Sequence, residues 1–263
     1  MSVLRAAAPG ELPQITAFLR EERETAVLAD ACVGRVHPLY FELYGEWEGA
    51  ELRAVFARLF GVWHAALSAQ ADAEQAAAFL NWARGKAELC GRPEQLARLE
   101  PLLHGVTERL EAPLLLRTGE MSQSGGEAVR AAQDAAALRA VHTLLADSGT
   151  FRMPGYEDFY LTRRTLLAKG LARTRGIWDK GMLLATASTL FESAGAAMLG
   201  AVATAPEALG AGLATQVVRA LCDELAAERK EALIAAYHPA ALHIYQKLGF
   251  VQIGTKRILR FAP

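Results

Sequence analysis

Residues 199–221, LGAVATAPEALGAGLATQVVRAL, run from an apolar segment through a glycine-containing loop into a second apolar pattern. Leu213, Val217 and Leu221 recur every four residues, which predicts the buried face of an amphipathic helix. A loop without bulky side chains that leads into a helix N-terminus directs several backbone N–H groups at one place. The stretch therefore predicts a strand, an anion-binding loop and a helix.

Two familiar glycine loops do not match this segment. A P-loop requires Lys followed by Ser or Thr after its last glycine, and Leu213 and Ala214 stand there. A dinucleotide-binding loop requires a third small position and an acidic residue at the end of the next strand. The segment GAGLAT has two glycines, and the next apolar segment ends in Tyr237 and His238. The P-loop is excluded, and a nucleotide-dependent oxidoreductase is a distant alternative.

The composition is that of a globular protein with no electrostatic preference for nucleic acid or membranes. Of 263 residues, 52% are hydrophobic and 22% are charged, with a net charge of -1. No apolar run approaches the ~20 residues of a membrane span, and the N-terminal residues lack the apolar core of a signal peptide. Cys32, Cys90 and Cys222 form no C-x-x-C pair, so we expect no disulfide and no metal site. A reducing cytoplasm fits this pattern.

The two halves of the chain show a similar order of expected elements. The first half predicts helices over 11–34, 73–84 and from residue 93, and strands over 38–45, 51–69 (two strands), 87–90 and 113–117. The second half predicts helices over 133–147, 155–170 and 238–249, a long helix after the glycine loop with its buried face at residues 213, 217, 221 and 225, and strands over 171–178, 182–191, 196–204 and 231–237, with a final pair of strands in 251–261. Polar residues 118–127 have the composition of a linker. The expected domains are therefore 1–117 and 128–263, joined by 118–127.

The segment 199–221, followed by ALHIYQKLGF at 241–250, resembles the GNAT superfamily of acetyl-CoA-dependent N-acetyltransferases. The resemblance is clear from Ala196 to Phe261 and extends back to Val129; in the first half it is architectural. It implies an α/β (α+β) fold with two GNAT-like domains, each a mixed, mostly antiparallel sheet flanked by helices. The first domain has no glycine loop after any expected strand and would be a degenerate copy.

The resemblance also implies a site for acetyl-CoA as co-substrate. Two strands, 196–204 and 231–237, would splay apart, with the pantetheine arm between them like a missing strand. The implied cofactor-binding residues are Val202, Ala203 and Thr204 of the strand, Leu209, Gly210, Ala211, Gly212, Leu213, Ala214 and Thr215 of the loop and helix start, and His238. Leu209 and Ala211 stand where relatives carry Arg and Lys, so binding would depend on backbone amides. For His238, helix capping is an equal alternative.

Catalytic residues are less evident. In family members with the same ending, the tyrosine at the position of Tyr245 protonates the departing thiolate; the alternative is a core aromatic residue. Glu192, at a strand end, is the first candidate for a general base; the alternative is an ordinary turn residue. A water chain could also remove the amine proton. Cys222 lies on the expected buried face, with no acid or histidine at a diagnostic spacing, and we interpret it as a core residue.

The function expected from the resemblance is transfer of an acetyl group to a primary amine by direct attack. The acceptor, a small-molecule amine or a peptide N-terminus, is not identifiable from the sequence, and a homodimer is left open. A non-catalytic acyl-CoA-binding or regulatory module is the alternative, because the loop lacks cationic side chains and no base is evident.

Overall fold

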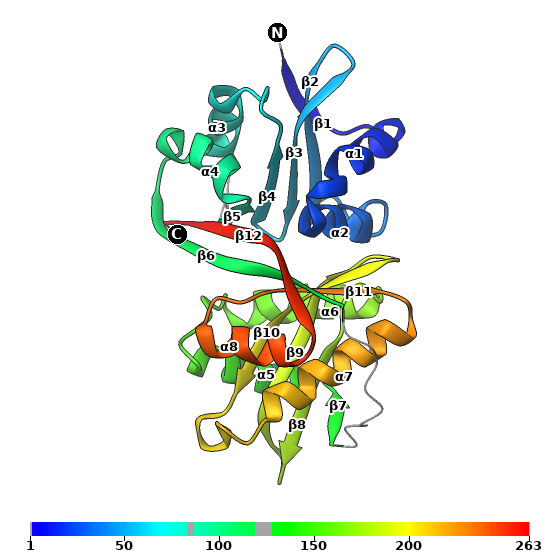
Figure 1. Ribbon diagram of the computed structural model, residues 1–263, viewed down its shortest axis with the longest axis vertical. Coiled ribbons are helices and arrows are strands. Elements are labelled where there is room, and N and C mark those ends of the chain that lie inside the picture. Colours follow the sequence, from blue (N-terminus) through cyan, green and yellow to red (C-terminus); the bar gives the residue numbers. More distant parts are fainter. Residues whose placement is uncertain (1, 84–86, 119–127, 263) are drawn as a thin grey trace. The chain divides into compact units, whose positions relative to one another are not determined.

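The chain divides into two compact units. The computed structural model describes residues 2–83, 87–118 and 128–262. Unit 1 comprises Met1–Leu114 with Gly254–Pro263, and unit 2 comprises Leu115–Ile253 (Figure 1). The last ten residues thus pack with the first unit, whereas the sequence placed all of 128–263 in one domain. Of the expected linker 118–127, all but Thr118 lies outside the described residues.

The two halves of the chain have the same order of elements, β-α-α-β-β-β-α-β-α-β. The sequence predicted a similar order in the two halves, but not the first strand of either one, Val3–Ala6 or Val129–Ala131. The first series is β1 (Val3–Ala6), α1 (Leu12–Phe18), α2 (Arg23–Cys32), β2 (Phe41–Glu48), β3 (Glu51–Leu59), β4 (Val62–Leu67), α3 (Ala73–Trp82), β5 (Glu88–Gly91), α4 (Pro93–Leu99) and β6 (Val106–Arg117). The second is β7 (Val129–Ala131), α5 (Ala135–Asp147), α6 (Tyr156–Ala168), β8 (Thr174–Asp179), β9 (Met182–Glu192), β10 (Ala196–Thr204), α7 (Leu213–Ala227), β11 (Glu231–Ala235), α8 (Pro239–Lys247) and β12 (Phe250–Phe261).

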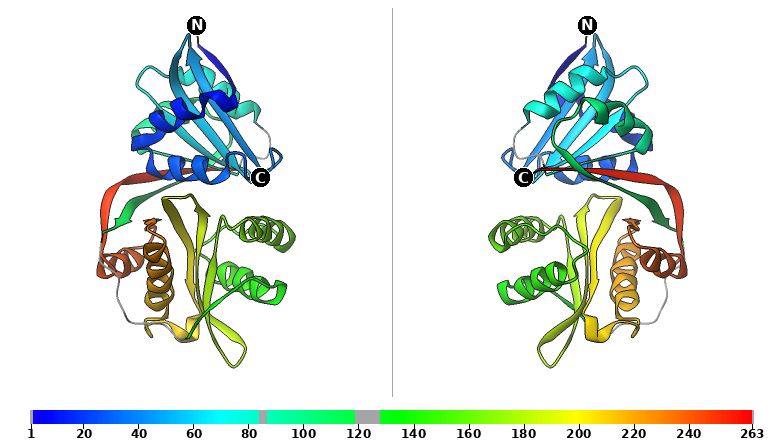
Figure 2. Two further views of the ribbon diagram at one scale, coloured as in Figure 1. Left: turned by 90° about the vertical axis from the view of Figure 1, so that its right-hand side faces the viewer. Right: turned by 90° about the vertical axis from the view of Figure 1, so that its left-hand side faces the viewer.

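The sheet of unit 2 has the strand order β11-β10-β9-β8-β7, with the end of β6 beside β11. Its neighbours β7–β8, β8–β9 and β9–β10 are antiparallel, whereas β10 and β11 are parallel. Helices α5 and α6 cover one face and α7 and α8 the other (Figure 2). The expected stripe of α7 is confirmed, because Val217, Leu221 and Leu225 are fully buried. They form one core with Leu199 and Ile234 of the central strands.

Unit 1 has the order β1-β2-β3-β4-β5-β12, followed by β6. Here β4 and β5 are the parallel pair, and β12 pairs antiparallel with β5 at Ile258↔Cys90. The pair of strands expected in 251–261 is wrong: β12 is one strand. Gly254 lies inside this strand without a positive φ, and the chain continues extended through it.

The helix expected over 11–34 is also interrupted. Helices α1 and α2 are separated by the 3₁₀ turn Leu19–Glu21. Glu22, with φ -94° and ψ 62°, is not helical. It ends the 3₁₀ turn and is the N-cap of α2. This break separates two short helices at the edge of the cavity described below.

An ion pair inside unit 1 ties β12 to its core. Lys256 of β12 is buried, and its Nζ contacts Glu24 Oε1 on α2. His64 Nδ1 of β4 lies 3.7 Å from the same oxygen. Burial lowers the pKa of His64 to about 4, so this imidazole is neutral near pH 7.

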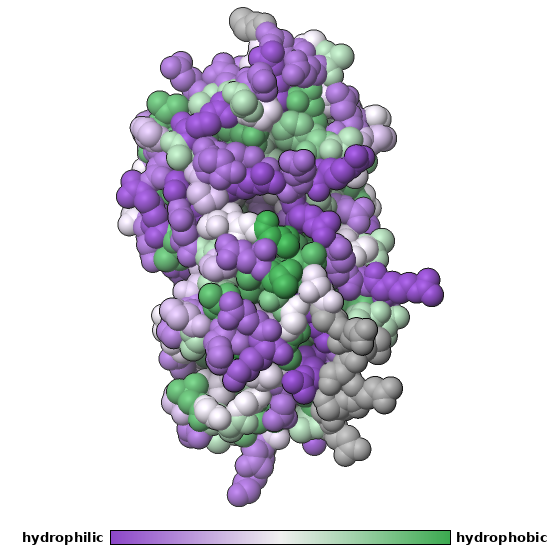
Figure 3. All heavy atoms as spheres, in the orientation of Figure 1, coloured by the Kyte–Doolittle hydropathy of each residue, from purple (hydrophilic) through white to green (hydrophobic). Residues whose placement is uncertain are grey.

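Polar and charged side chains cover most of the face in Figure 3. Among the residues that the structure describes, no helix is long and apolar enough to cross a membrane.

Candidate cofactor and active site

The parallel strands β10 and β11 separate part-way along their length. Their pairing runs from Ala196↔Glu231 to Leu199↔Ile234 and stops there, although β10 continues to Thr204. Residues 200–204 therefore have no β11 partner on that edge. The resemblance to GNAT proteins led us to expect that these two strands splay apart. Unpaired strand N–H and C=O groups can accept an extended, amide-bearing ligand as an added strand.

A β-bulge lies on the same segment of β10. Gly200 pairs with Ser188 and Ala203 with Thr186 of β9, so β10 has one residue more than β9 between these pairs. Ala201 adopts a positive φ of 52°, which is uncommon for a residue with a side chain. A Cβ at Gly200 would lie 2.9 Å from Leu190 Cδ1, so the Leu190 side chain would have to shift to admit any other residue. This bulge was not predicted from the sequence, although a glycine within an otherwise regular strand is a signal for one.

The loop after β10 leaves the start of α7 open. It contains a short 3₁₀ helix, Pro206–Ala208, and Gly210 and Gly212 with φ of 80° and 74°. Gly212 is the N-cap of α7, and no side chain caps the helix. Gln216 N donates to Gly212 O, so the N–H groups of residues 213–215 precede the first intrahelical bond. Such N–H groups, together with the helix dipole, favour an anion.

The equivalent helix of unit 1 is closed to an anion. The N-cap of α3 is Asp72, whose carboxylate accepts from Gln75 N at 3.0 Å. Asp72 N in turn donates to Glu46 Oε1 at 3.0 Å. A carboxylate of the protein thus occupies the position at the helix start that α7 leaves free. Of these two helices, α7 of unit 2 is the one whose N-terminus is open to a phosphate.

His238 is the N-cap of α8, and its Nδ1 accepts from Ala240 N at 3.2 Å. The capping alternative is therefore realised. This bond places the proton of a neutral imidazole on Nε2, which leaves one donor on the exposed residue.

Tyr245 lies on α8 in the core of unit 2 and is 4% exposed. Its ring is 5.8 Å from that of Phe250, and burial, with a smaller contribution from Cys222, raises the pKa of its phenol. A phenol with a raised pKa stays protonated at neutral pH, so it retains a proton to donate. The same burial fits the core alternative, and the role of Tyr245 stays a prediction.

Glu192 is separated from the loop by the length of β10. It pairs with Ala197 near the start of that strand, and the seven residues from there to Thr204 span about 20 Å. Its carboxylate accepts from Arg173 Nε and Nη2, both at 2.7 Å, and lies 3.0 Å from Lys230 Nζ. Despite desolvation, these hydrogen bonds and the charge of Arg173 keep the pKa of Glu192 below its usual range. This geometry gives Glu192 a structural role, linking the ends of the sheet and α7, and it is a poor candidate for a base.

Solved structures with the same architecture include proteins described as acetyltransferases. A tandem GNAT protein from the clavulanic acid biosynthesis pathway is 13% identical with a TM-score of 0.62, over 100% of this chain and 99% of its own. The chain has a tandem GNAT fold. A GCN5-related N-acetyltransferase from Sphaerobacter thermophilus is 14% identical with a TM-score of 0.61, over 100% and 96% of the two chains. A GNAT-family acetyltransferase from Colwellia psychrerythraea is 15% identical with a TM-score of 0.58, over 99% and 100%.

At these identities the structural likeness establishes the GNAT fold and not a substrate. In addition, residues 175–259 match the family model described as FR47-like protein. That segment contains the bulge, the loop, α7 and Tyr245. No curated protein matches the sequence.

Among the described residues of unit 2, the groups available to a ligand at this site are backbone N–H donors. No group of three or more His, Cys, Asp or Glu side chains among them could hold a metal ion. Burial raises the pKa of Cys222 to about 12, so its thiol is not ionised near pH 7. The arrangement is suited to binding a phosphate-bearing, amide-bearing molecule along β10.

Proposed function

We propose that unit 2 transfers an acetyl group from acetyl-CoA to a primary amine. The observation that carries this proposal is the combination of an unpaired β10 edge with an uncapped helix N-terminus directly after it. The edge supplies groups for the pantetheine amides, and residues 209–215 supply backbone N–H groups for the pyrophosphate. Val202, Ala203 and Thr204 would contact the pantetheine, and His238 would approach the cofactor through Nε2.

The proposed chemistry is a direct acyl transfer. The neutral amine forms a C–N bond with the thioester carbonyl, the C–S bond breaks, and the sulfur leaves as a thiolate that takes a proton. Tyr245 is the proposed donor of that proton. Backbone N–H groups at the bulge around Ala201 are the available donors to the carbonyl oxygen as negative charge develops on it. The amine proton leaves through water, and water returns a proton to Tyr245, since Glu192 is committed to Arg173 and Lys230.

A non-catalytic acyl-CoA-binding module is the second candidate. It is favoured by the depth at which Tyr245 is buried and by the ion pairs of Glu192. Such a module would bind acetyl-CoA through the same backbone groups and release it unchanged.

Turnover separates the two functions. The full chain is incubated with acetyl-CoA and one amine in each reaction. The amines are an amino acid, an aminoglycoside, a polyamine and a peptide with a free N-terminus. Free thiol and acetylated product are both measured. Formation of both with any amine supports the transferase, while tight acetyl-CoA binding with neither product supports the binding module. Absence of acetyl-CoA binding contradicts both.

A further inference from the structure

The β9–β10 pair of unit 2 contains two bulges, one on each strand. Consecutive residues of β10 pair with Phe191 and Thr189 of β9, so Leu190 is an extra residue on β9. The second bulge is the one at Ala201 of β10. Because the extra residues lie on opposite strands, their effects on the register cancel. From Ala203 onward the two strands therefore pair in the same register as before Leu190.

The second bulge depends on the first. One extra residue on β10 alone would shift every later β9–β10 pair by one residue, and such a slip turns side chains to the wrong face of the sheet. Ala203 and Ala205, which follow the second bulge, are buried in one core with residues of α5. The extra residue Leu190 keeps them in that register. Its side chain also lies against Gly200, directly before Ala201.

Arg163 of α6 contacts β9 at the first bulge. It is 7% exposed, and among the described residues its hydrogen bonds all go to uncharged oxygen atoms. Its Nη1 and Nη2 both donate to Thr189 O at 3.1 Å, and Nη2 also donates to Thr174 Oγ1 at 2.8 Å. Burial lowers the pKa of Arg163 to about 10, so the guanidinium stays charged near pH 7. A buried charge is costly unless it is hydrogen-bonded, so these bonds determine where Arg163 lies.

The hydrogen bonds beside this bulge are irregular. Thr189 N donates to Arg173 O at 2.9 Å, as in a regular antiparallel pair. In such a pair Arg173 N would donate back to Thr189 O, but it donates to Thr189 Oγ1 at 2.8 Å. The guanidinium of Arg163 supplies donors to Thr189 O instead. Without Arg163, this buried carbonyl would lose those donors, which favours a return to regular pairing.

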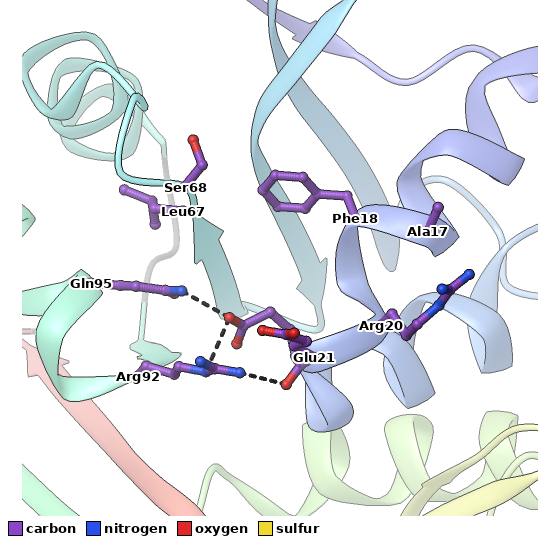
Figure 4. Close-up of a pocket in the computed structure, with 9 residues that line it drawn as sticks. Ala17, Phe18, Arg20, Glu21, Leu67, Ser68, Arg92 and Gln95 are labelled. Carbon is purple, nitrogen blue, oxygen red and sulfur yellow. Dashed lines mark hydrogen bonds and ion pairs between the residues drawn. The ribbon is translucent and has the colours of Figure 1, made fainter.

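The equivalent strands of unit 1 pair differently. β3 and β4, which hold the places of β9 and β10 in the order of elements, keep one register along their whole paired length. Leu67, at the end of β4, lines a cavity of about 480 Å³ within unit 1 (Figure 4). Arg92 lines the same cavity, and its Nε lies 3.1 Å from Glu22 Oε1 on a helical segment. The paired bulges of β9 and β10 thus occur in the unit whose helix N-terminus is open.

We propose that Arg163 is a positioning residue for acetyl transfer. By holding the bulge at Leu190, it holds the compensating bulge at Ala201, whose backbone N–H groups are the proposed donors to the thioester carbonyl oxygen. The effect on rate rests on the proposed function of unit 2, whereas the effect on register does not. Without Arg163 the two bulges disappear together. Leu199 then faces Leu190, while residues from Ala203 onward and the loop 209–215 keep their places.

Arg163→Met tests this in the full chain, because it removes the donors and keeps an unbranched side chain. NMR measures the intraresidue HN–Hα NOE and three-bond coupling of Ala201, which together report the sign of its φ, 52° in the structure. Calorimetry measures the Kd for acetyl-CoA, and steady-state assays with the most active amine measure kcat. We expect Ala201 to lose its positive φ and kcat to fall at least ~10-fold, since a misplaced donor forfeits part of the roughly 10²–10³-fold that an oxyanion donor contributes. The Kd should stay within about threefold, because the N–H groups of residues 209–215 keep their places.

Two further variants separate positioning from stability. Phe159→Leu, one turn earlier on α6, is the matched control, because it weakens core packing without removing a bond to β9 and should keep both φ and kcat. Arg163→Lys keeps one charged donor for Thr189 O, so it should retain the positive φ of Ala201 and lose no more than about threefold in kcat.

The outcomes that overturn the proposal differ from those that overturn the proposed function. A folded Arg163→Met variant that keeps the positive φ of Ala201, or that keeps its kcat, refutes the positioning role. So does a folded Arg163→Lys variant that keeps the positive φ and yet loses kcat at least ~10-fold, because the rate would then not follow the register. Absence of turnover by the unmodified chain refutes the transferase instead, and the NMR comparison still decides whether Arg163 holds the register.

Discussion

Replacing Gly212 by Asp would place a carboxylate at the start of α7. Gly212 has a φ of 74°, a conformation that Asp and Asn tolerate better than other side chains. No atom lies within 4 Å of a Cβ built at this position, so the side chain has room. The new carboxylate would then lie beside the N–H groups of residues 213–215 that are proposed to hold the pyrophosphate, and would repel it.

The penalty follows from Coulomb's law. A carboxylate about 5 Å from one phosphate charge, at an effective dielectric constant of about 20, costs about 3 kcal/mol. That energy corresponds to a rise of about 100-fold in the Kd for acetyl-CoA. At a cofactor concentration of 100 times the original Kd, the stabilisation of the folded protein would fall from about 2.7 to about 0.4 kcal/mol.

Calorimetric titration of the full chain with acetyl-CoA measures the Kd directly. Gly212→Asn is the matched control, because it has the same shape without the charge and should stay within about threefold of the original Kd. Added salt should narrow the difference between the Asp and Asn variants, since it screens exposed charges. If both variants bind like the unmodified protein, residues 209–215 do not hold the pyrophosphate and the cofactor proposal fails.

Three further changes test other parts of the structure. Tyr245→Phe should lower kcat about 100-fold with Kd for acetyl-CoA nearly unchanged if the phenol protonates the thiolate; an unchanged kcat in steady-state assays would make it a core residue. Glu192→Gln should lower the free energy of unfolding by about 2 kcal/mol in urea titrations, because it removes the buried carboxylate charge that pairs with Arg173 and Lys230, both of which keep Glu228 as a partner. A large loss of kcat in the folded variant would contradict the structural role of Glu192. The pKa of His64 is lowered from 6.5 to about 4 in the folded protein, so its contribution to stability is present above pH 6.5 and is lost as the pH falls toward 4, by roughly 3 kcal/mol. His64→Gln should flatten the unfolding free energy over that range, and an unaltered pH profile would show that Glu24, Lys256 or other groups dominate it.

Much of unit 2 was accessible from local patterns. The four-residue spacing of α7 reports its buried face, because side chains four apart share one side of a helix. Pro239 and Gly249 mark the ends of α8, where a missing N–H and a positive φ are tolerated. The glycine loop predicted an anion site, and the uncapped start of α7 is consistent with it. In each case, the interactions that define the feature lie within a few residues along the chain.

Other features depend on partners distant in sequence. Glu192 at a strand end had the pattern of a candidate base, but Arg173 and Lys230 reach it only once β8, β9 and the end of α7 pack together. The bulge at Ala201 is defined by its register against Thr186 and Ser188 of β9, which the composition of β10 alone does not specify.

The pairing of β12 with a strand of unit 1 is the clearest example. The sequence of an extended segment does not specify its partner strand, because any strand edge offers the same N–H and C=O groups. Pairing with β5 and burial of Lys256 against Glu24 draw residues 254–263 into unit 1. These contacts join residues more than 160 positions apart, and only the assembled fold brings them together.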